Sequence, residues 1–166
     1  MPFHLSVVGR KNSGKTRLVS LLAAELTRRG LRVATVKTTS HDHEFDVPGT
    51  DSWQHRQAGS LAAIILSPGR WVCHTERPDG PALEALHGTL FRDKDLVLWE
   101  GRGHESAPRI ECVPVGEESL FRGDPLLAAV VSESADSLAP RWFTPSAISD
   151  LTDWIIGNLA VSPARD

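Results

Sequence analysis

The amino-acid sequence predicts an α/β fold, in which a mostly parallel, twisted sheet is flanked by helices and carries extra antiparallel edge strands. Two stretches carry this prediction. Residues 3–30 read as a short apolar strand, a glycine-rich loop and an amphipathic helix. Residues 95–103 read as a buried strand that ends in an acidic residue. Because helices connect successive strands, right-handed crossovers and parallel strands are expected.

Composition limits the classes of protein to consider. The chain has 166 residues and a formal net charge of −3. We therefore expect one domain over residues 1–166, with residues 160–166 as a loose tail, and no nucleic-acid partner. No apolar run approaches the roughly 18 residues of a membrane helix, and the chain starts with a strand rather than a signal, so we expect a cytoplasmic protein. Cys73 and Cys112 are expected to be reduced core residues.

Residues 9–16, GRKNSGKT, fit the pattern G-x-x-x-x-G-K-[ST] of a phosphate-binding loop. Gly9 and Gly14 allow the backbone to turn tightly and approach an anion. Lys15 is expected to reach the β- and γ-phosphate oxygens, and the hydroxyl of Thr16 to bind Mg²⁺. A strand before the loop and a helix after it are the context that this motif requires, which predicts a P-loop NTPase-like fold.

The remaining elements follow from periodicity and from turn residues. The first helix is expected to end near Arg29, before Gly30, and residues 31–37 to form a strand that pairs in parallel with the first. Residues 61–66 are apolar throughout and predict a buried strand. The other predictions are strands at 70–75, 96–99, 109–115, 128–131 and 142–143, and helices at 52–57, 82–92 and 146–159.

Residues 38–52 form a polar loop without periodicity, at the ligand side of the predicted sheet. It contains the clustered polar residues His41, Asp42, His43, Glu44 and Asp46. Three interpretations remain open. The loop is a divalent metal site, a solvated acidic loop, or a switch-like segment near Mg²⁺ and the γ-phosphate.

Glu100 stands at the carboxyl end of the strand at residues 96–99. An acidic residue in that position can hold Mg²⁺ opposite Thr16, directly or through water, as the Walker B acid does. The alternative is a strand-end carboxylate that faces solvent. Gly101 and Gly103 do not make a dinucleotide fingerprint, because the pattern G-x-G-x-x-G is incomplete.

Four stretches resemble the MobB family of molybdopterin-guanine dinucleotide biosynthesis adaptor proteins. They are GRKNSGKTRL from residue 9, HDHEFDVPGTDSWQHRQAG from residue 41, DLVLWEG from residue 95 with His104 and Glu105, and DPLLAAVVSES from residue 124. The phosphate loop alone is generic, and the second and third stretches make the resemblance specific. Two positions depart from the family pattern. Arg102-Gly103 replace an aromatic residue and a lysine, and Glu133 stands where an aspartate is usual.

The resemblance implies a GTP-binding accessory protein that forms a homodimer and hydrolyses GTP slowly at most. Its implied partners are a MobA-like guanylyltransferase, which transfers GMP from GTP onto molybdopterin, and molybdoenzymes. The implied cofactors are GTP and Mg²⁺, with Thr16 and Glu100 at the metal. The implied nucleotide-binding residues are Gly9, Arg10, Lys11, Asn12, Ser13, Gly14, Lys15, Thr16, Arg17, Asp46, Asp51 and Arg56.

Three other functions remain open. A small-molecule kinase would share the phosphate loop and use ATP, with Arg56, Arg102 and Arg109 as available arginines. An adaptor could carry a purely structural nucleotide. A nucleic-acid GTPase is disfavoured by the acidic balance. Because no N-K-x-D guanine motif occurs in the sequence, the expectation of GTP rests on the resemblance alone.

Overall fold

A computed structural model describes residues 1–135 and 139–159, which fall into two compact units. The smaller unit comprises residues 40–87 and the larger comprises the described residues outside that range. The expectation of one domain stays a prediction, and the predicted tail at 160–166 lies outside the described residues. The elements are β1 (Phe3–Gly9), α1 (Lys15–Arg28), β2 (Val33–Lys37), α2 (Asp51–Gln57), β3 (Ala62–Ser67), β4 (Arg70–Thr75), α3 (Gly80–Leu90), β5 (Leu96–Glu100), β6 (Arg109–Cys112), β7 (Leu127–Val131), β8 (Trp142–Phe143) and α4 (Ile148–Asn158).

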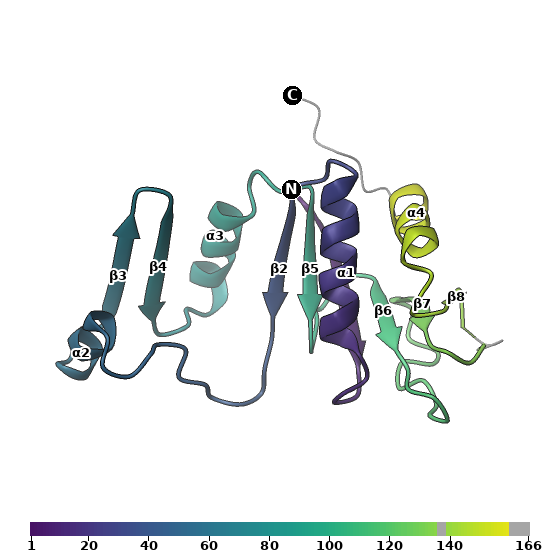
Figure 1. Ribbon diagram of the computed structural model, residues 1–166, viewed down its shortest axis with the longest axis horizontal. Helices are drawn as coiled ribbons and strands as arrows, with labels where there is room; N and C mark the ends of the chain where they lie inside the picture. The colour runs from purple at the N-terminus through teal and green to yellow at the C-terminus, as the bar shows by residue number, and fades with distance from the viewer. Residues whose placement is uncertain (136–138, 160–166) are drawn as a thin grey trace. The chain divides into compact units, whose positions relative to one another are not determined.

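The larger unit contains a six-stranded sheet with the order β2-β5-β1-β6-β7-β8, in which each neighbouring pair is parallel (Figure 1). The prediction that β1 and β2 pair directly is wrong. β5 lies between them, and Leu96 is in register with both Phe3 and Val33. Every residue of β5 is buried. Such a uniformly buried strand belongs in the centre of a parallel sheet, where both of its edges and both of its faces are covered.

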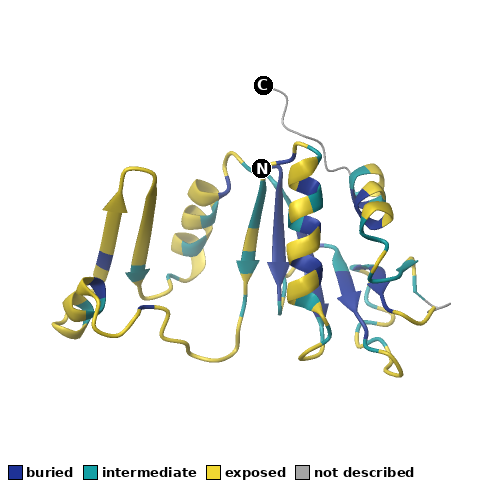
Figure 2. Cartoon of the chain, in the orientation of Figure 1, coloured by how far each residue is buried: buried dark blue, intermediate teal, exposed yellow. Residues whose placement is uncertain are grey.

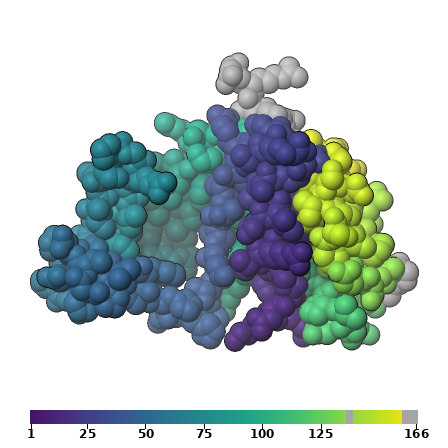
Figure 3. Space-filling view, viewed as in Figure 1, coloured from purple at the N-terminus to yellow at the C-terminus, as the bar shows by residue number. Residues whose placement is uncertain are grey.

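Helices α1 and α4 lie side by side on one face of this sheet (Figures 1 and 3). On α1, the residues Leu18, Leu22 and Leu26 recur at helical spacing and are buried against the sheet. Arg29, just after α1, contacts Glu25 on α1 and Asp153 on α4. The main core therefore holds α1 firmly over the sheet, with its first turn directly after β1.

The order of the strands creates a crevice at the carboxyl end of β1. The chain passes from β5 to β6, which lie on opposite sides of β1. In open α/β sheets, ligands bind at such a point, outside the carboxyl ends of the strands. The loop between β1 and α1 occupies that point (Figure 1).

The smaller unit is built around the antiparallel hairpin β3–β4, which forms a sheet of its own rather than an edge of the main sheet. The predicted strand at residues 61–66 is confirmed as β3, but the prediction that it is buried is wrong. The exposed fractions of Ile64 and Leu66 are 61% and 78%, and Trp71 on β4 is also exposed. Most of both strands of the hairpin has the colour of exposed residues in Figure 2. An apolar run does not bury itself when only two strands are available, because nothing within this unit forms a second layer over most of the hairpin.

Several element ends differ from the sequence prediction. β6 ends at Cys112, short of the predicted residue 115, since Pro114 cannot donate a ladder hydrogen bond. The two cysteines are free, and Cys112 is buried as expected, but Cys73 is exposed because it lies on the uncovered hairpin. None of the described helices is long and apolar enough to cross a membrane.

Candidate functional site

The loop after β1 needs glycine at two positions for steric reasons. Gly9 has φ +134°, and a Cβ atom there would lie 2.4 Å from the carbonyl oxygen of Cys112. Gly14 has φ +92° and is the N-cap residue, directly before the first residue of α1. Asn12, between them, has φ +62°, a left-handed conformation that asparagine adopts more readily than most residues. The motif glycines therefore shape the loop that the sequence predicts.

The N-terminus of α1 is well suited to an anion. No side chain caps it, and its first turn carries no acidic residue. The free backbone N–H groups and the positive end of the helix dipole therefore remain available at the loop. In the described structure, the buried hydroxyl of Ser13 has no hydrogen-bond partner. Burying a hydroxyl without a partner is costly, so this atom fits a bound phosphate oxygen.

Three basic side chains lie on the loop itself, and Lys11 is exposed. The ammonium of Lys15 donates to the carbonyl oxygens of Gly9, at 3.0 Å, and Arg10. The guanidinium of Arg10 forms an ion pair with Glu117, and both side chains are substantially exposed. Lys15 thus lies over the concave side of the loop, whereas Arg10 is held at its outer edge.

Thr16 and Glu100 are 84 residues apart in sequence, and the fold brings them into contact. The Thr16 hydroxyl donates to Oε1 of Glu100 at 2.5 Å. The Lys37 ammonium lies 3.2 Å from the same oxygen, and Glu100 is buried. The three residues come from the start of α1 and the ends of β5 and β2. Their predicted role at Mg²⁺ stays a prediction, but a hydroxyl and a carboxylate are suitable oxygen ligands.

The glycines after β5 have a structural role that the sequence analysis missed. A Cβ atom at Gly101 would lie 2.4 Å from the carbonyl oxygen of Thr38, and one at Gly103 would lie 2.6 Å from Oγ of Ser6. The Thr38 hydroxyl donates to the Glu100 carbonyl oxygen at 3.0 Å and accepts from the backbone N–H of Arg102 at 2.8 Å. The sequence feature that could have indicated this role is the pair of glycines that directly follows the acidic residue at the end of β5. These contacts fix the backbone that carries Glu100.

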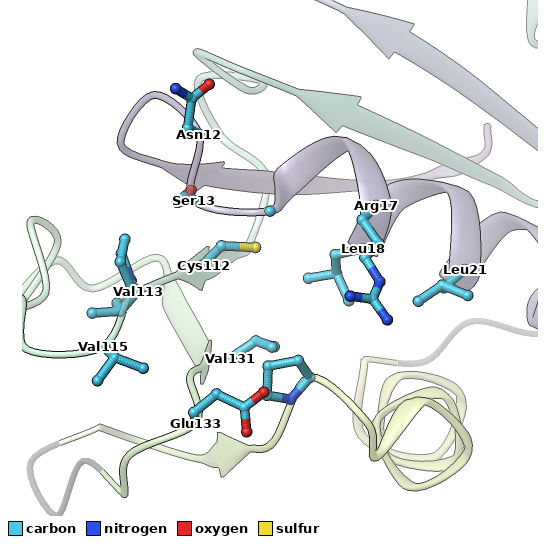
Figure 4. A pocket seen from close by; sticks show the side chains of 13 residues that line it. Asn12, Ser13, Arg17, Leu18, Leu21, Cys112, Val113, Val115, Val131 and Glu133 are labelled. Carbon is cyan, nitrogen blue, oxygen red and sulfur yellow. The ribbon is translucent and has the colours of Figure 1, made fainter.

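A cavity of about 290 Å³ adjoins the phosphate loop (Figure 4). It extends from the loop and α1 to the ends of β6 and β7, and its lining includes Asn12, Ser13, Arg17, Leu18, Leu21, Cys112, Val113, Val115, Val131, Glu133 and Pro145. Burial raises the pKa of the Cys112 thiol to about 12, so this side chain is a neutral part of the wall. A separate hollow of about 410 Å³ is lined by Thr16, Ser20, Thr35, Lys37 and Glu100, together with apolar residues of α1 and β2.

In the smaller unit, Asp46 is buried at the centre of a polar network. Its Oδ1 accepts from the hydroxyls of Ser52 at 2.9 Å and Thr50 at 3.2 Å, and lies 3.6 Å from Nε2 of His74. Burial alone would raise the pKa of Asp46, but the Ser52 hydrogen bond, the His74 charge and the Thr50 hydrogen bond together lower it. His74 is a member of this network that sequence reasoning missed, because it belongs to β4.

Arg56 joins the same network. Its guanidinium lies 2.8 Å from Oε1 of Glu44 and 3.7 Å from Oδ2 of Asp46. The hydrogen bond from Arg56 lowers the pKa of Glu44. Asp51 is exposed in the first turn of α2. The predicted contacts of Asp46, Asp51 and Arg56 with nucleotide, and a switch-like movement of this loop, stay predictions. Within residues 1–135 and 139–159, no three His, Cys, Asp or Glu side chains are grouped as metal ligands.

The chain is similar to known proteins over much of its length. Residues 4–133 match the family model of MobB, described as molybdopterin guanine dinucleotide synthesis protein B. The molybdopterin-guanine dinucleotide biosynthesis adapter protein of Haemophilus influenzae is 38% identical over 107 residues, which cover 64% of this chain and 60% of that protein. The Escherichia coli protein of the same description is 38% identical over 109 residues, covering 64% and 62%. The matches thus span about three-fifths of the length of these curated relatives.

Solved structures extend the similarity over nearly the whole fold. A crystal structure of molybdopterin-guanine biosynthesis protein B superposes with a TM-score of 0.70 at 26% identity, covering 95% of this chain and 99% of that one. A MobB protein homolog from Bacillus stearothermophilus gives a TM-score of 0.69, covering 96% and 99%. At 24% identity, the second structure bears on the fold alone. The predicted fold class, a P-loop NTPase-like α/β fold with a mostly parallel sheet flanked by helices, is confirmed, and the predicted antiparallel strands form a small sheet of their own.

Replacing Gly9 tests how tightly the loop is packed. We expect Gly9→Ala to lower the melting temperature more than Gly116→Ala, because only the first places a Cβ atom against backbone, at 2.4 Å from Cys112. Both glycines have positive φ, and Gly116 has no atom within 4 Å of the added Cβ. Gly116→Ala should therefore lower the free energy of unfolding only by the cost of a left-handed backbone at a residue with a Cβ atom, about 1–2 kcal/mol. Equal losses in thermal unfolding would contradict the close approach of β1 and β6.

Proposed function

This chain belongs to the MobB family of molybdopterin guanine dinucleotide synthesis proteins, and on that premise we propose that it is a GTP-binding accessory protein. The observation that carries the proposal is the loop at residues 9–16, which joins β1 to the uncapped start of α1. The buried hydroxyl of Ser13 and the ammonium of Lys15 both belong to this loop. They supply a hydrogen-bond donor and a positive charge, which are the groups that a polyphosphate requires.

Thr16 and Glu100 would hold Mg²⁺, and Lys37 would contact Glu100 from the end of β2. Mg²⁺ usually keeps several waters and binds through one or two protein oxygens together with substrate phosphates. The contact of 2.5 Å between the two side chains supports a shared site. When bound, the metal would neutralise charge on the β- and γ-phosphates. The protein's own contribution is to fix both oxygen ligands on rigid elements, at the start of α1 and the end of β5.

Hydrolysis of GTP by the isolated protein should be slow at most. Fast phosphoryl transfer usually needs a positive side chain at the γ-phosphate as well as the loop lysine. The arginine on the loop, Arg10, is engaged by Glu117. We propose that a partner or a second copy supplies the missing group. The partner would be a guanylyltransferase that transfers GMP from GTP onto molybdopterin, and the finished cofactor would pass to molybdoenzymes.

We propose that the second copy docks on the β3–β4 hairpin. Leu66 is in register with Trp71, and Ile65 with Val72, so each face of the hairpin carries an exposed apolar pair. Isolated two-stranded sheets are marginally stable, and contiguous exposed apolar surface marks interfaces. If two copies pair through this hairpin, the same apolar surface is covered on each copy, as in a two-fold symmetric dimer.

Calorimetric titration with GTP and ATP, each with and without Mg²⁺, tests the nucleotide. Lys15→Ala should weaken GTP binding by at least roughly 10- to 100-fold, because charge-assisted hydrogen bonds to the phosphates are lost. Lys94→Ala, which removes an ammonium paired with Asp93, is the matched control and should bind as the parent does. If GTP binding survives Lys15→Ala, the assignment of the loop is wrong. A preference for ATP would favour the small-molecule kinase instead.

The metal assignment has its own test. Glu100→Gln should weaken GTP binding in the presence of Mg²⁺ more than in its absence, because a neutral amide is a poorer ligand for a hard cation than a carboxylate. We expect a difference of roughly 10-fold or more between the two conditions. Equal weakening with and without Mg²⁺ would remove Glu100 from the metal site. Glu105→Gln, at an exposed position beyond the same strand, is the control.

Sedimentation or light scattering tests the proposed dimer. The parent protein should have twice the mass of one chain, and Leu66→Asp should have the mass of one chain, since a charge cannot be buried unpaired in an apolar interface. Leu120→Asp changes a leucine that is exposed in the larger unit, with an exposed fraction of 50%, and should stay dimeric. A monomeric parent, or a dimeric Leu66→Asp variant, would contradict docking on the hairpin.

A further inference from the structure

We propose that the cavity beside the phosphate loop is a guanine-selective base site, and that Glu133 and Arg17 are the residues that read the base. This inference rests on the proposed function, because it takes the phosphates to lie on residues 9–16. It adds the source of the nucleotide preference, for which the sequence contains no guanine motif.

The position of the cavity follows from the direction in which a nucleotide must extend. Thr16, Lys37 and Glu100 line the hollow beside β2, so the metal and the terminal phosphates belong on that side. The cavity of about 290 Å³ begins at Asn12 and Ser13 and extends toward the ends of β6 and β7, away from the hollow beside β2. The ribose and base therefore belong in the cavity beside β6 and β7 rather than in the hollow beside β2.

The walls of the cavity are apolar on facing sides. Leu18 and Leu21 project from α1, whereas Val113, Val115 and Val131 come from the ends of β6 and β7 (Figure 4). Small-molecule sites are typically lined in this way, by apolar side chains with a few polar groups that fix orientation. A flat purine can lie between such walls with both of its faces covered.

Two charged side chains project toward the cavity from different elements. Arg17 comes from the first turn of α1, and Glu133 comes from the segment that follows β7 (Figure 4). Among the ion pairs of the described residues, none involves either side chain. Both are therefore available to a ligand without breaking an existing salt bridge.

The backbone before Glu133 is well anchored. Ser132 is buried, and its N–H donates to the Phe143 carbonyl oxygen at 3.1 Å. Its carbonyl oxygen accepts from Nε1 of Trp142 at 3.1 Å. These bonds tie the end of β7 to β8, so the carboxylate of Glu133 is presented from a fixed point at the rim of the cavity.

The two charges match the polar edges of guanine. The carboxylate of Glu133 accepts hydrogen bonds only, and guanine offers its N1–H and 2-amino donors side by side. The guanidinium of Arg17 donates only, and guanine offers the acceptors O6 and N7. Adenine carries an amino donor in place of O6, an acceptor at N1 and no 2-amino group, so the contact with Glu133 becomes unfavourable and the contact with Arg17 is reduced to N7. Each good bidentate contact discriminates by about 1–3 kcal/mol, or roughly 5- to 150-fold.

Exchange of the carboxylate for an amide provides a sharp test. Calorimetry would compare GTP, ATP and xanthosine triphosphate, in which an oxygen replaces the 2-amino group, on the parent and on Glu133→Gln. The parent should prefer GTP. The variant should lose roughly 10- to 100-fold for GTP and gain for xanthosine triphosphate, because the new amide N–H can donate to the 2-oxo group. Glu133 is exposed, so this isosteric change should leave the fold intact.

Two further variants complete the experiment. Glu118→Gln removes an exposed carboxylate that does not line this cavity, and should retain the parent's preference. Arg17→Gln should weaken GTP and inosine triphosphate alike, because both carry O6 and N7. Unchanged base preference in Glu133→Gln, with binding that still depends on Lys15, would overturn the base site and leave the phosphate site standing. Failure of the parent to bind any of the triphosphates would overturn the proposed function as well.

Discussion

The contact between Thr16 and Glu100 depends on more of the structure than any other feature of the site. It requires β5 to lie beside β1, so that the end of β5 faces the start of α1, the helix that follows β1. It also requires the chain after Glu100 to turn sharply, which Gly101 permits by its close approach to Thr38. The buried carboxylate is held in place from its backbone side by Thr38 and meets Lys37 and Thr16 at its oxygen. The geometry of the proposed metal site is therefore a consequence of strand order.

The phosphate loop divides its surroundings into two chemically different sides. On the β2 side lie the hydroxyl and carboxylate oxygens of Thr16 and Glu100, with the charge of Lys37. On the side of β6 and β7 the facing walls are apolar, the buried Cys112 thiol is neutral, and the charged groups are Arg17 and Glu133. A nucleotide has the same asymmetry, since its phosphates and metal are polar and its base is flat and largely apolar on its faces. The phosphates and metal therefore match the β2 side of the loop, and the base matches the side of β6 and β7.

In the smaller unit, the stretch from residue 41 that resembles the family contacts the β3–β4 hairpin. Asp46 lies in that stretch, and it contacts His74 on β4 as well as Ser52 at the start of α2. The buried Oδ2 of Asp46 has no hydrogen-bond partner within the described residues, although Arg56 lies 3.7 Å from it. The polar network and the exposed apolar strands thus belong to one small body. Any partner that covers the hairpin acts on the same unit that carries Asp46 and Arg56.

The sequence by itself determined the phosphate loop, the helix after it and the strand that ends in Glu100. Each of these depends on local patterns: glycine spacing, helical periodicity and a short apolar run. Only the tertiary structure decided that β5 separates β1 from β2, that Gly101 and Gly103 make close backbone contacts, and that His74 meets Asp46. It also decided that residues 61–66 are exposed and that Arg17 and Glu133 share a cavity. The physical reason is the same in each case, because local chemistry selects the type of element, whereas burial and contact depend on which distant segment lies next to it.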